Sequence, residues 1–486
     1  MRRRVAITVA AAAAVAGVGA ATAASAPGAG LALPSAGFCV PAPSDPAMVP
    51  RAIGALDAAA SATPTRPIAI LDTGVDPDAP QLAGRVLPGW DAATGAPISG
   101  DWDGHGTSAA GLAASAGPGM AGVSPGSPIL PVRIYAPGSR VAALDVVARG
   151  VGLAVARGAG VVVVEGSVPA AGASDDEWRT LVTAVDAAFA KGAIVVTGMG
   201  DDTLPDANLP SSLPHVLAAG AATATPSRSA PVDTGPWLDL LVPGEGVTAP
   251  LPLSLCPVGF GFATGSSFAA PALGGAVALV QAARPALTTQ QLFEVVRRAG
   301  TDLGTGGRDD DSGYGLLSLP AALSAAPPAK DTSAEPDDDP YWVRSPAYAK
   351  RHPPLLTRTK LRFKATGTVS PAKDPADVYR VSLTKRERLV VNVRAADPNA
   401  LLELAILDPR VERFDVTDDV AEWALVATGG LSSDPQLELT AARSGTFFVA
   451  VTAAPAVDPD DAAQTAAEVE PYTLSAYKQR KRAKKK

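Results

Sequence analysis

The sequence predicts an α/β domain, with a parallel β-sheet covered by helices on both faces, followed by a separate antiparallel β-sandwich. Three observations support this prediction. Residues 67–324 alternate short apolar runs with longer segments of helical periodicity, which is typical of a parallel sheet with crossover helices. Residues 325–355 are rich in Pro, Ala, Asp and Ser and predict a linker. Residues 356–477 contain short strand-like runs between turns, without helical periodicity.

The first domain should contain fully buried strands, because its apolar runs are not interrupted by polar residues. These runs lie at residues 68–71, 161–164 and 193–196. Helices are expected at residues 144–157, 176–191 and 289–299, where apolar residues follow plausible helix starts. The strands of the second domain are expected at residues 378–383, 389–393, 401–407, 446–451 and 472–477.

The amino terminus has the features of a secretory signal peptide over residues 1–26. Three arginines precede an apolar run from Val5 to Val18, and small residues at 24–26 offer a cleavage site. A retained membrane anchor is the alternative, although the run is shorter than the ~20 residues that a spanning helix needs. We therefore expect a secreted or cell-envelope protein whose mature chain begins with an extension, residues 27–66.

Cys39 and Cys256 are the only cysteines. In an oxidising compartment, two cysteines suggest one disulfide, and the alternative is two unpaired thiols. The net charge of −7 gives no argument for binding nucleic acid. Beyond the expected signal peptide, basic residues are conspicuous only at positions 478–486, a tail that could contact an anionic envelope polymer or be a solvated end.

Three short motifs contain the residue types of a nucleophilic catalytic site. Asp72 follows a buried strand, so it should lie at the carboxyl edge of the sheet, where open α/β proteins form their sites. His105 stands between Gly104 and Gly106, which permit a close approach of the backbone around an imidazole. Each motif alone also fits an ordinary turn.

The third motif is Gly265-Ser266-Ser267-Phe268-Ala269-Ala270-Pro271, followed by an apolar helix. Ser267 would lie at the amino terminus of this helix, where free N–H groups can stabilise an oxyanion. An ordinary helix-capping serine is the alternative. Pro271 is expected in the first turn, where proline is tolerated.

Together, these motifs in the order Asp, His, Ser resemble the subtilisin-like serine peptidases, over residues 67–323. The resemblance implies that Ser267 attacks the scissile carbonyl of a protein or peptide, His105 transfers the proton, and Asp72 orients His105. Phe268, together with residues 235–239 and 243–245, is similar to the mycosin branch, although we find no terminal membrane helix of the mycosin kind.

Two departures from the family pattern bear on activity. Asp201 occupies the position of the family asparagine that donates to the oxyanion, unless the alignment is shifted and another donor lies nearby. An ionised carboxylate cannot donate, so Asp201 helps only when it is protonated. We therefore expect activity to be slow at neutral pH and to increase toward acid until His105 is protonated.

The second departure lies in the substrate cleft. The segment containing Ser167 and Pro169 replaces a family strand that pairs with the substrate backbone, and Pro169 removes one N–H donor. Altered or narrow cleavage specificity is expected. The 40 residues of the extension, 27–66, leave little room for the usual inhibitory prodomain.

The second domain is similar to bacterial pre-peptidase C-terminal domains, which are accessory sandwiches. No zinc-type ligand spacing is present, and no cofactor is required. Acidic loops at residues 309–311 and 458–461 could hold structural calcium, or could be solvated turns. The rival to an active endopeptidase is a catalytically degenerate subtilisin-like scaffold that binds envelope or secretion-system partners.

Overall fold

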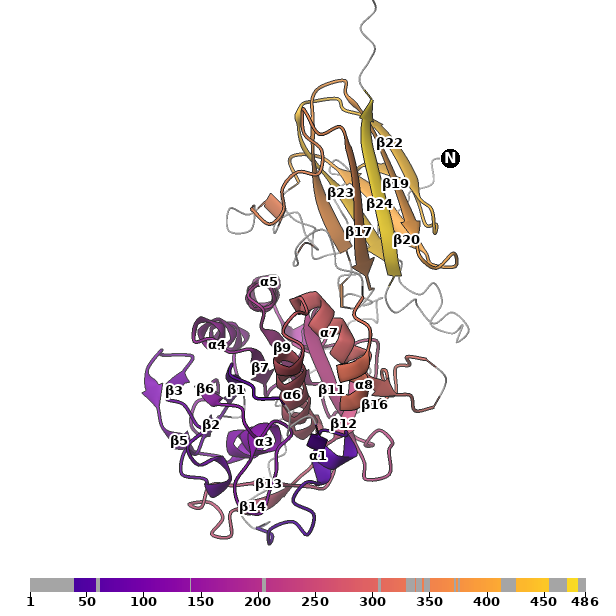
Figure 1. The fold of residues 1–486 in the computed structure, drawn as a ribbon. Helices are drawn as coiled ribbons and strands as arrows, with labels where there is room; N and C mark the ends of the chain where they lie inside the picture. The colour runs from indigo at the N-terminus through magenta and orange to yellow at the C-terminus, as the bar shows by residue number, and fades with distance from the viewer. Residues whose placement is uncertain are drawn as a thin grey trace, which may run out of the picture. The chain divides into compact units, whose positions relative to one another are not determined.

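The computed structural model describes residues 39–57, 62–139, 141–202, 207–304, 307–328, 337, 343–344, 350–370, 373–374, 376–411, 425–453 and 470–479. The expected signal peptide, residues 458–461 and residues 480–486 of the basic tail lie outside the described residues. The chain divides between Pro327 and Pro328 into two compact units, the α/β domain and the sandwich domain. Figure 1 shows both.

The α/β domain is built on a ten-stranded sheet in which every strand pair from β16 to β3 is parallel, while an antiparallel strand closes each edge. In spatial order the strands are β15 (Gly300–Thr301), β16 (Leu316–Leu317), β12 (Leu240–Pro243), β11 (Val216–Ala222), β9 (Ile194–Gly198), β7 (Val161–Val164), β1 (Ile68–Asp72), β6 (Ile129–Arg133), β3 (Gly89–Asp91) and β4 (Pro97–Ile98). The three strands expected from the sequence are therefore β1, β7 and β9.

Helices cover both faces of this sheet, as the apolar strands predict (Figure 1). Alternate residues of each strand point to opposite faces. Ile70 and Val163 pack in one core with α3 (His105–Ala114) and α6 (Ser266–Ala283). Their neighbours Leu71 and Val164 pack in another core with α4 (Leu144–Ala156) and α5 (Asp175–Ala190). The remaining helices are α1 (Met48–Ala52), α7 (Thr289–Arg297) and α8 (Leu319–Ser324).

Helix α6 crosses the interior of the α/β domain. By length and composition it could cross a membrane, but 83% of it is buried within the domain, as in the core helix of a soluble fold. Our placement of Pro271 in its first turn was wrong, because the helix begins at Ser266 and Pro271 is its sixth residue. Pro271 therefore has no N–H with which to bind the carbonyl oxygen of Ser267.

The extension before the first strand is attached to the α/β domain. Cys39 forms a disulfide with Cys256, which lies between β13 (Val247–Pro250) and β14 (Phe260–Ala263). The N–H of Val40 donates to the carbonyl oxygen of Phe260 at 3.0 Å. The predicted disulfide is thus confirmed, and it joins the extension to the segment that precedes Ser267.

The sandwich domain consists of two four-stranded antiparallel sheets around a shared core, which confirms the predicted class. One sheet contains β17 (Arg362–Val369), β24 (Glu470–Gln479), β19 (Arg388–Ala395) and β22 (Gln436–Thr440); the other contains β18 (Ala376–Leu383), β23 (Gly445–Ala453), β20 (Leu402–Leu407) and β21 (Leu425–Thr428).

Two expected boundaries of this domain need correction. Val343 and Leu355, which we assigned to the linker, are buried in the cores of this domain, where they pack against apolar side chains of its strands. Lys478, which we assigned to the basic tail, belongs to β24. Its ammonium group is buried and donates to the carbonyl oxygens of Thr357 and Ser382.

Candidate active site

The site is organised by three adjacent parallel strands. Asp72 is the last residue of β1, Glu165 directly follows β7, and Asp201 lies three residues after β9. The carboxyl ends of parallel strands meet at one edge of a sheet, which is where α/β folds place their sites. This edge therefore holds three carboxyl groups side by side.

His105 is the first residue of α3 and contacts Asp72. Its Nδ1 lies 2.7 Å from Oδ2 of Asp72, and the N–H of Thr73 donates to Oδ1 at 2.6 Å. His105 is only 2% exposed and Asp72 is fully buried. Gly106 permits the contact, because a Cβ atom there would lie 1.9 Å from the carbonyl oxygen of Gly74.

Asp101 fixes the turn that carries His105. Its Oδ1 accepts from the hydroxyl of Thr73 at 2.7 Å and from the N–H groups of Asp103 and Gly104 at 3.1 and 2.9 Å. Its Oδ2 accepts from the N–H and hydroxyl of Thr107 at 2.8 and 2.7 Å. One carboxylate thus connects the end of β1 to the first turn of α3.

Ser267 is the second residue of α6, and the next residue in the helix, Phe268, contacts His105. The ring of its neighbour Phe268 lies 5.0 Å from the His105 ring, measured between centroids. Gly265, the residue before the helix, has φ of 138°, and a Cβ atom there would lie 2.9 Å from Oδ2 of Asp201. Ser267 itself is 8% exposed, which leaves its side chain at the edge of solvent.

Asp201 contacts the residue directly before Ser267. Both carboxyl oxygens of Asp201 lie 2.9 Å from the N–H of Ser266, and Oδ2 accepts from the Ser266 hydroxyl at 2.9 Å. The Asp201 carboxyl therefore lies at the amino terminus of α6, against the residue that is next to Ser267 in the chain.

Burial and neighbouring charges shift the pKa values at this edge. Burial alone would lower the pKa of His105, but the contact with Asp72 and the other carboxyl groups nearby outweigh burial and raise this pKa to about 9. Burial raises the pKa of Asp201, although its hydrogen bonds from Ser266 oppose the shift. Burial also raises the pKa of Glu165 well above its usual value.

The raised pKa of His105 opposes our expectation that activity increases toward acid, which stays a prediction. The neutral imidazole is the form that accepts a proton. With a pKa of about 9, His105 is mostly protonated at neutral pH, so further acidification removes the remaining base. Activity limited by His105 should instead rise as pH increases through about 9.

Ser167 and Pro169 line a small cavity near this edge. Val168 and Pro169 form β8, which pairs with β10 (Asn208–Leu209). The cavity has a volume of about 80 Å³ and also contacts Tyr135, Leu144 and Leu209. It is bounded largely by apolar side chains, which suits an apolar group.

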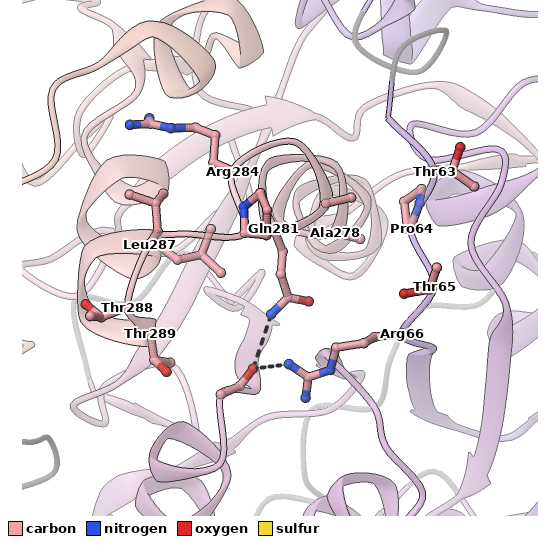
Figure 2. A pocket seen from close by; sticks show the side chains of 14 residues that line it. Thr63, Pro64, Thr65, Arg66, Ala278, Gln281, Arg284, Leu287, Thr288 and Thr289 are labelled. Atoms are coloured by element: carbon pink, nitrogen blue, oxygen red, sulfur yellow. Dashed lines mark hydrogen bonds between the residues drawn. The ribbon is translucent and has the colours of Figure 1, made fainter.

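A larger cavity of about 390 Å³ lies at the opposite end of the sheet (Figure 2). Arg66 lies before β1, and Gln281 lies near the carboxyl end of α6, 14 residues after Ser267. A helix rises about 1.5 Å per residue, so Gln281 is roughly 21 Å from Ser267. This cavity is therefore separate from Ser267 and the residues around it.

The acidic loop at residues 309–311 is occupied by contacts within the protein. Asp310 pairs with Arg308 at 3.1 Å and Asp311 with Arg228 at 3.2 Å. Oδ1 of Asp309 accepts from the N–H and hydroxyl of Ser312. Within the described part of the chain, no group of three or more His, Cys, Asp or Glu residues could hold a metal ion.

Sequence reasoning missed two residues of this site, Asp101 and Glu165. Asp101 had a local signal, because a carboxylate four residues before His105 can cap the helix that begins there. Glu165 had a signal in the strand pattern, because it follows a buried strand as Asp72 does. We read its segment only as part of the substrate cleft.

Comparison with known proteins identifies the family. Residues 66–315, half of the chain, match the model of the subtilase family of S8 peptidases. The chain is 31% identical to thermitase of Thermoactinomyces vulgaris over 218 residues, 44% of this chain and 74% of thermitase. It is 28% identical to subtilisin BL of Lederbergia lenta over 257 residues, 52% of this chain and 89% of that protein.

A solved structure shares the fold. The crystal structure of a lanthipeptide protease superimposes with a TM-score of 0.50 and 23% identity, over 57% of this chain and 93% of that chain. The α/β domain thus has a subtilisin-like fold, and the chain belongs to the subtilase family. It is a subtilisin-like serine endopeptidase, whose substrates are proteins or peptides.

Proposed function

We propose that Asp72, His105 and Ser267 form the catalytic triad of this endopeptidase. The contact between His105 Nδ1 and Asp72 Oδ2 at 2.7 Å is the observation that carries the proposal. It fixes the tautomer that leaves Nε2 free to take the proton of Ser267, which attacks the scissile carbonyl. His105 then donates this proton to the leaving amine.

Asp201 makes oxyanion stabilisation depend on pH. When it is protonated, its O–H can donate a hydrogen bond to the oxyanion, and when it is ionised it repels the developing charge. Its position against the Ser266 N–H supports this assignment. Because burial raises its pKa, activity persists to higher pH than an ordinary aspartate would allow, and decreases once Asp201 ionises.

We assign substrate binding to the cavity beside Ser167 and Pro169, which suits an apolar side chain. Val168 and Pro169 are already paired with β10, and Pro169 has no N–H to offer the substrate. Narrow cleavage specificity follows. The disulfide and the arginine-led apolar start of the chain support secretion.

The test is labelling of the purified protein by a fluorophosphonate probe at several pH values, with Ser267→Ala as the control. We expect labelling of the parent and none of Ser267→Ala. We also expect the variant to lose about 10⁶-fold in kcat on peptides, because the nucleophile is absent.

The degenerate scaffold is favoured by one observation, the carboxyl group of Asp201 where the family has an amide. A folded parent protein that is not labelled at any pH would support that second candidate and contradict the triad.

A further inference from the structure

Glu165 is a buried carboxyl group beside the proposed triad with no evident structural role. It is 1% exposed, and neither of its carboxyl oxygens has a hydrogen-bond partner within the described part of the chain. A buried polar group without a partner is destabilising, typically by about 1–3 kcal/mol. A side chain that lowers stability in this way is a candidate for a role in the site.

The strand register places Glu165 next to Asp72. Leu71 of β1 pairs with Val164 of β7, and the N–H of Glu165 donates to the carbonyl oxygen of Leu71 at 3.0 Å. Asp72 and Glu165 are the next pair along this register. Neighbouring strands are about 4.8 Å apart, and residues in register point to the same face.

That face is the one covered by α3 and α6. Ile70 and Val163, two residues before Asp72 and Glu165, pack in the core that these helices share. Side chains alternate along a strand, so Asp72 and Glu165 point to this face as well. Glu165 therefore faces the helices that carry His105 and Ser267.

The surroundings of Glu165 contain one titratable base and several acids. Asp72 comes from β1, His105 from α3, Asp201 from the segment after β9, and Tyr135 from the segment after β6. The Tyr135 hydroxyl donates to the main-chain oxygen of Glu165 at 2.6 Å and leaves the carboxyl group free. The further charged groups around His105 and Thr73 are Asp101, Asp103 and Arg133.

Two adjacent buried carboxyl groups do not both ionise readily, and they titrate as a pair with their neighbours. Asp72 receives hydrogen bonds from His105 and Thr73, while Glu165 receives none, so Glu165 retains its proton to higher pH. Once ionised, Glu165 attracts the protonated imidazole.

We propose that Glu165 is a positioning residue of the catalytic site, whose carboxyl group gains and loses a proton beside Asp72 and thereby controls how strongly His105 binds its own proton. The inference rests on the triad proposed above. The proton that Glu165 loses passes to solvent, and no covalent step is involved.

The test compares Glu165→Gln with its parent by the rate of fluorophosphonate labelling across pH. Both proteins carry Asp201→Asn, so that ionisation of Asp201 does not change oxyanion stabilisation during the titration. The curves should coincide in acid, because glutamine has the shape of protonated glutamate. In alkali the variant should reach its plateau roughly half to one pH unit earlier, at a plateau roughly two- to fivefold lower.

Glu245→Gln, which removes an exposed carboxyl group of the same domain, is the matched control and should leave the curve unchanged. Identical curves for Glu165→Gln and its parent would overturn the proposal. Loss of labelling by Glu165→Gln in acid would also overturn the proposal. In acid the parent carries a protonated, neutral Glu165, so a neutral glutamine should support the same rate of labelling.

Thermal unfolding across pH tests the proton on Glu165 without relying on activity. A carboxyl group whose folded pKa is raised favours folding below its unfolded pKa and loses this contribution as pH rises through the folded value. The parent should therefore lose stability in alkali relative to Glu165→Gln. Parallel unfolding curves would contradict the proposal, even if the parent is not labelled and the triad assignment has failed.

Discussion

The two ends of strands β1, β7 and β9 differ in how their charges are compensated. At the amino end lies Arg66, which Figure 2 labels. It donates to the carbonyl oxygens of Gly158, Ala159 and Gly192, at 3.4, 2.7 and 2.5 Å, in the loops before β7 and β9. At the carboxyl end, the carboxyl groups of Asp72 and Glu165 lie beside His105, and that of Asp201 contacts Ser266. The amino end is arranged for stability and the carboxyl end for reactivity.

The largest effect that would test this comparison is expected at Asp72. Asp72→Asn keeps the size of the side chain but removes the charge that stabilises the imidazolium and selects its tautomer. We expect kcat to decrease about 10⁴-fold, with little change in the free energy of unfolding. Steady-state kinetics and chemical denaturation measure both. Unchanged kcat would remove Asp72 from the triad.

A smaller effect of opposite sign is expected at Asp201. Asp201→Asn supplies an amide donor at every pH, and loss of such a donor from a subtilisin lowers kcat about 10²–10³-fold. We expect kcat to rise roughly 10- to 100-fold, most strongly in alkali, where the parent carboxyl is ionised. Asp57→Asn, at an exposed aspartate outside the site, is the control. If kcat does not rise, another group stabilises the oxyanion.

The smallest effect is expected at the amino end. Arg66→Met removes the donor to the carbonyl oxygens of Gly158 and Ala159 and one of the two side-chain donors to that of Gly192, which Gln281 also contacts. It should lower the free energy of unfolding by about 1–3 kcal/mol, with peptidase activity unchanged. Arg298→Met, at an exposed arginine, should change neither quantity. A loss of kcat in Arg66→Met would show that the two ends are not independent.

Local patterns made much of this architecture predictable. Uninterrupted apolar runs indicated β1, β7 and β9, because strands covered on both faces contain no polar residues. The glycines on either side of His105 indicated a close approach of two backbone segments there. The apolar run after Ser267 indicated a buried helix. Strand β17 was not predicted from the sequence, because the exposed residues Arg362 and Lys364 interrupt its apolar pattern.

The remaining features depend on contacts between distant segments. Glu165 and Asp72 are far apart in sequence, and only the register of β7 on β1 makes them neighbours. Val343 reads as linker because its local composition is polar, yet it is buried by strands that follow it in the chain. Neither contact can be predicted from the residues that are close to it in the sequence.

The disulfide between Cys39 and Cys256 also bears on how this enzyme would survive its own activity. The two cysteines are 217 positions apart, and the loop between them contains Asp72 and His105. A single cut anywhere in that loop leaves both fragments covalently attached. Self-digested enzyme would therefore migrate as an intact chain on a denaturing gel without reductant, and would separate into pieces only after reduction.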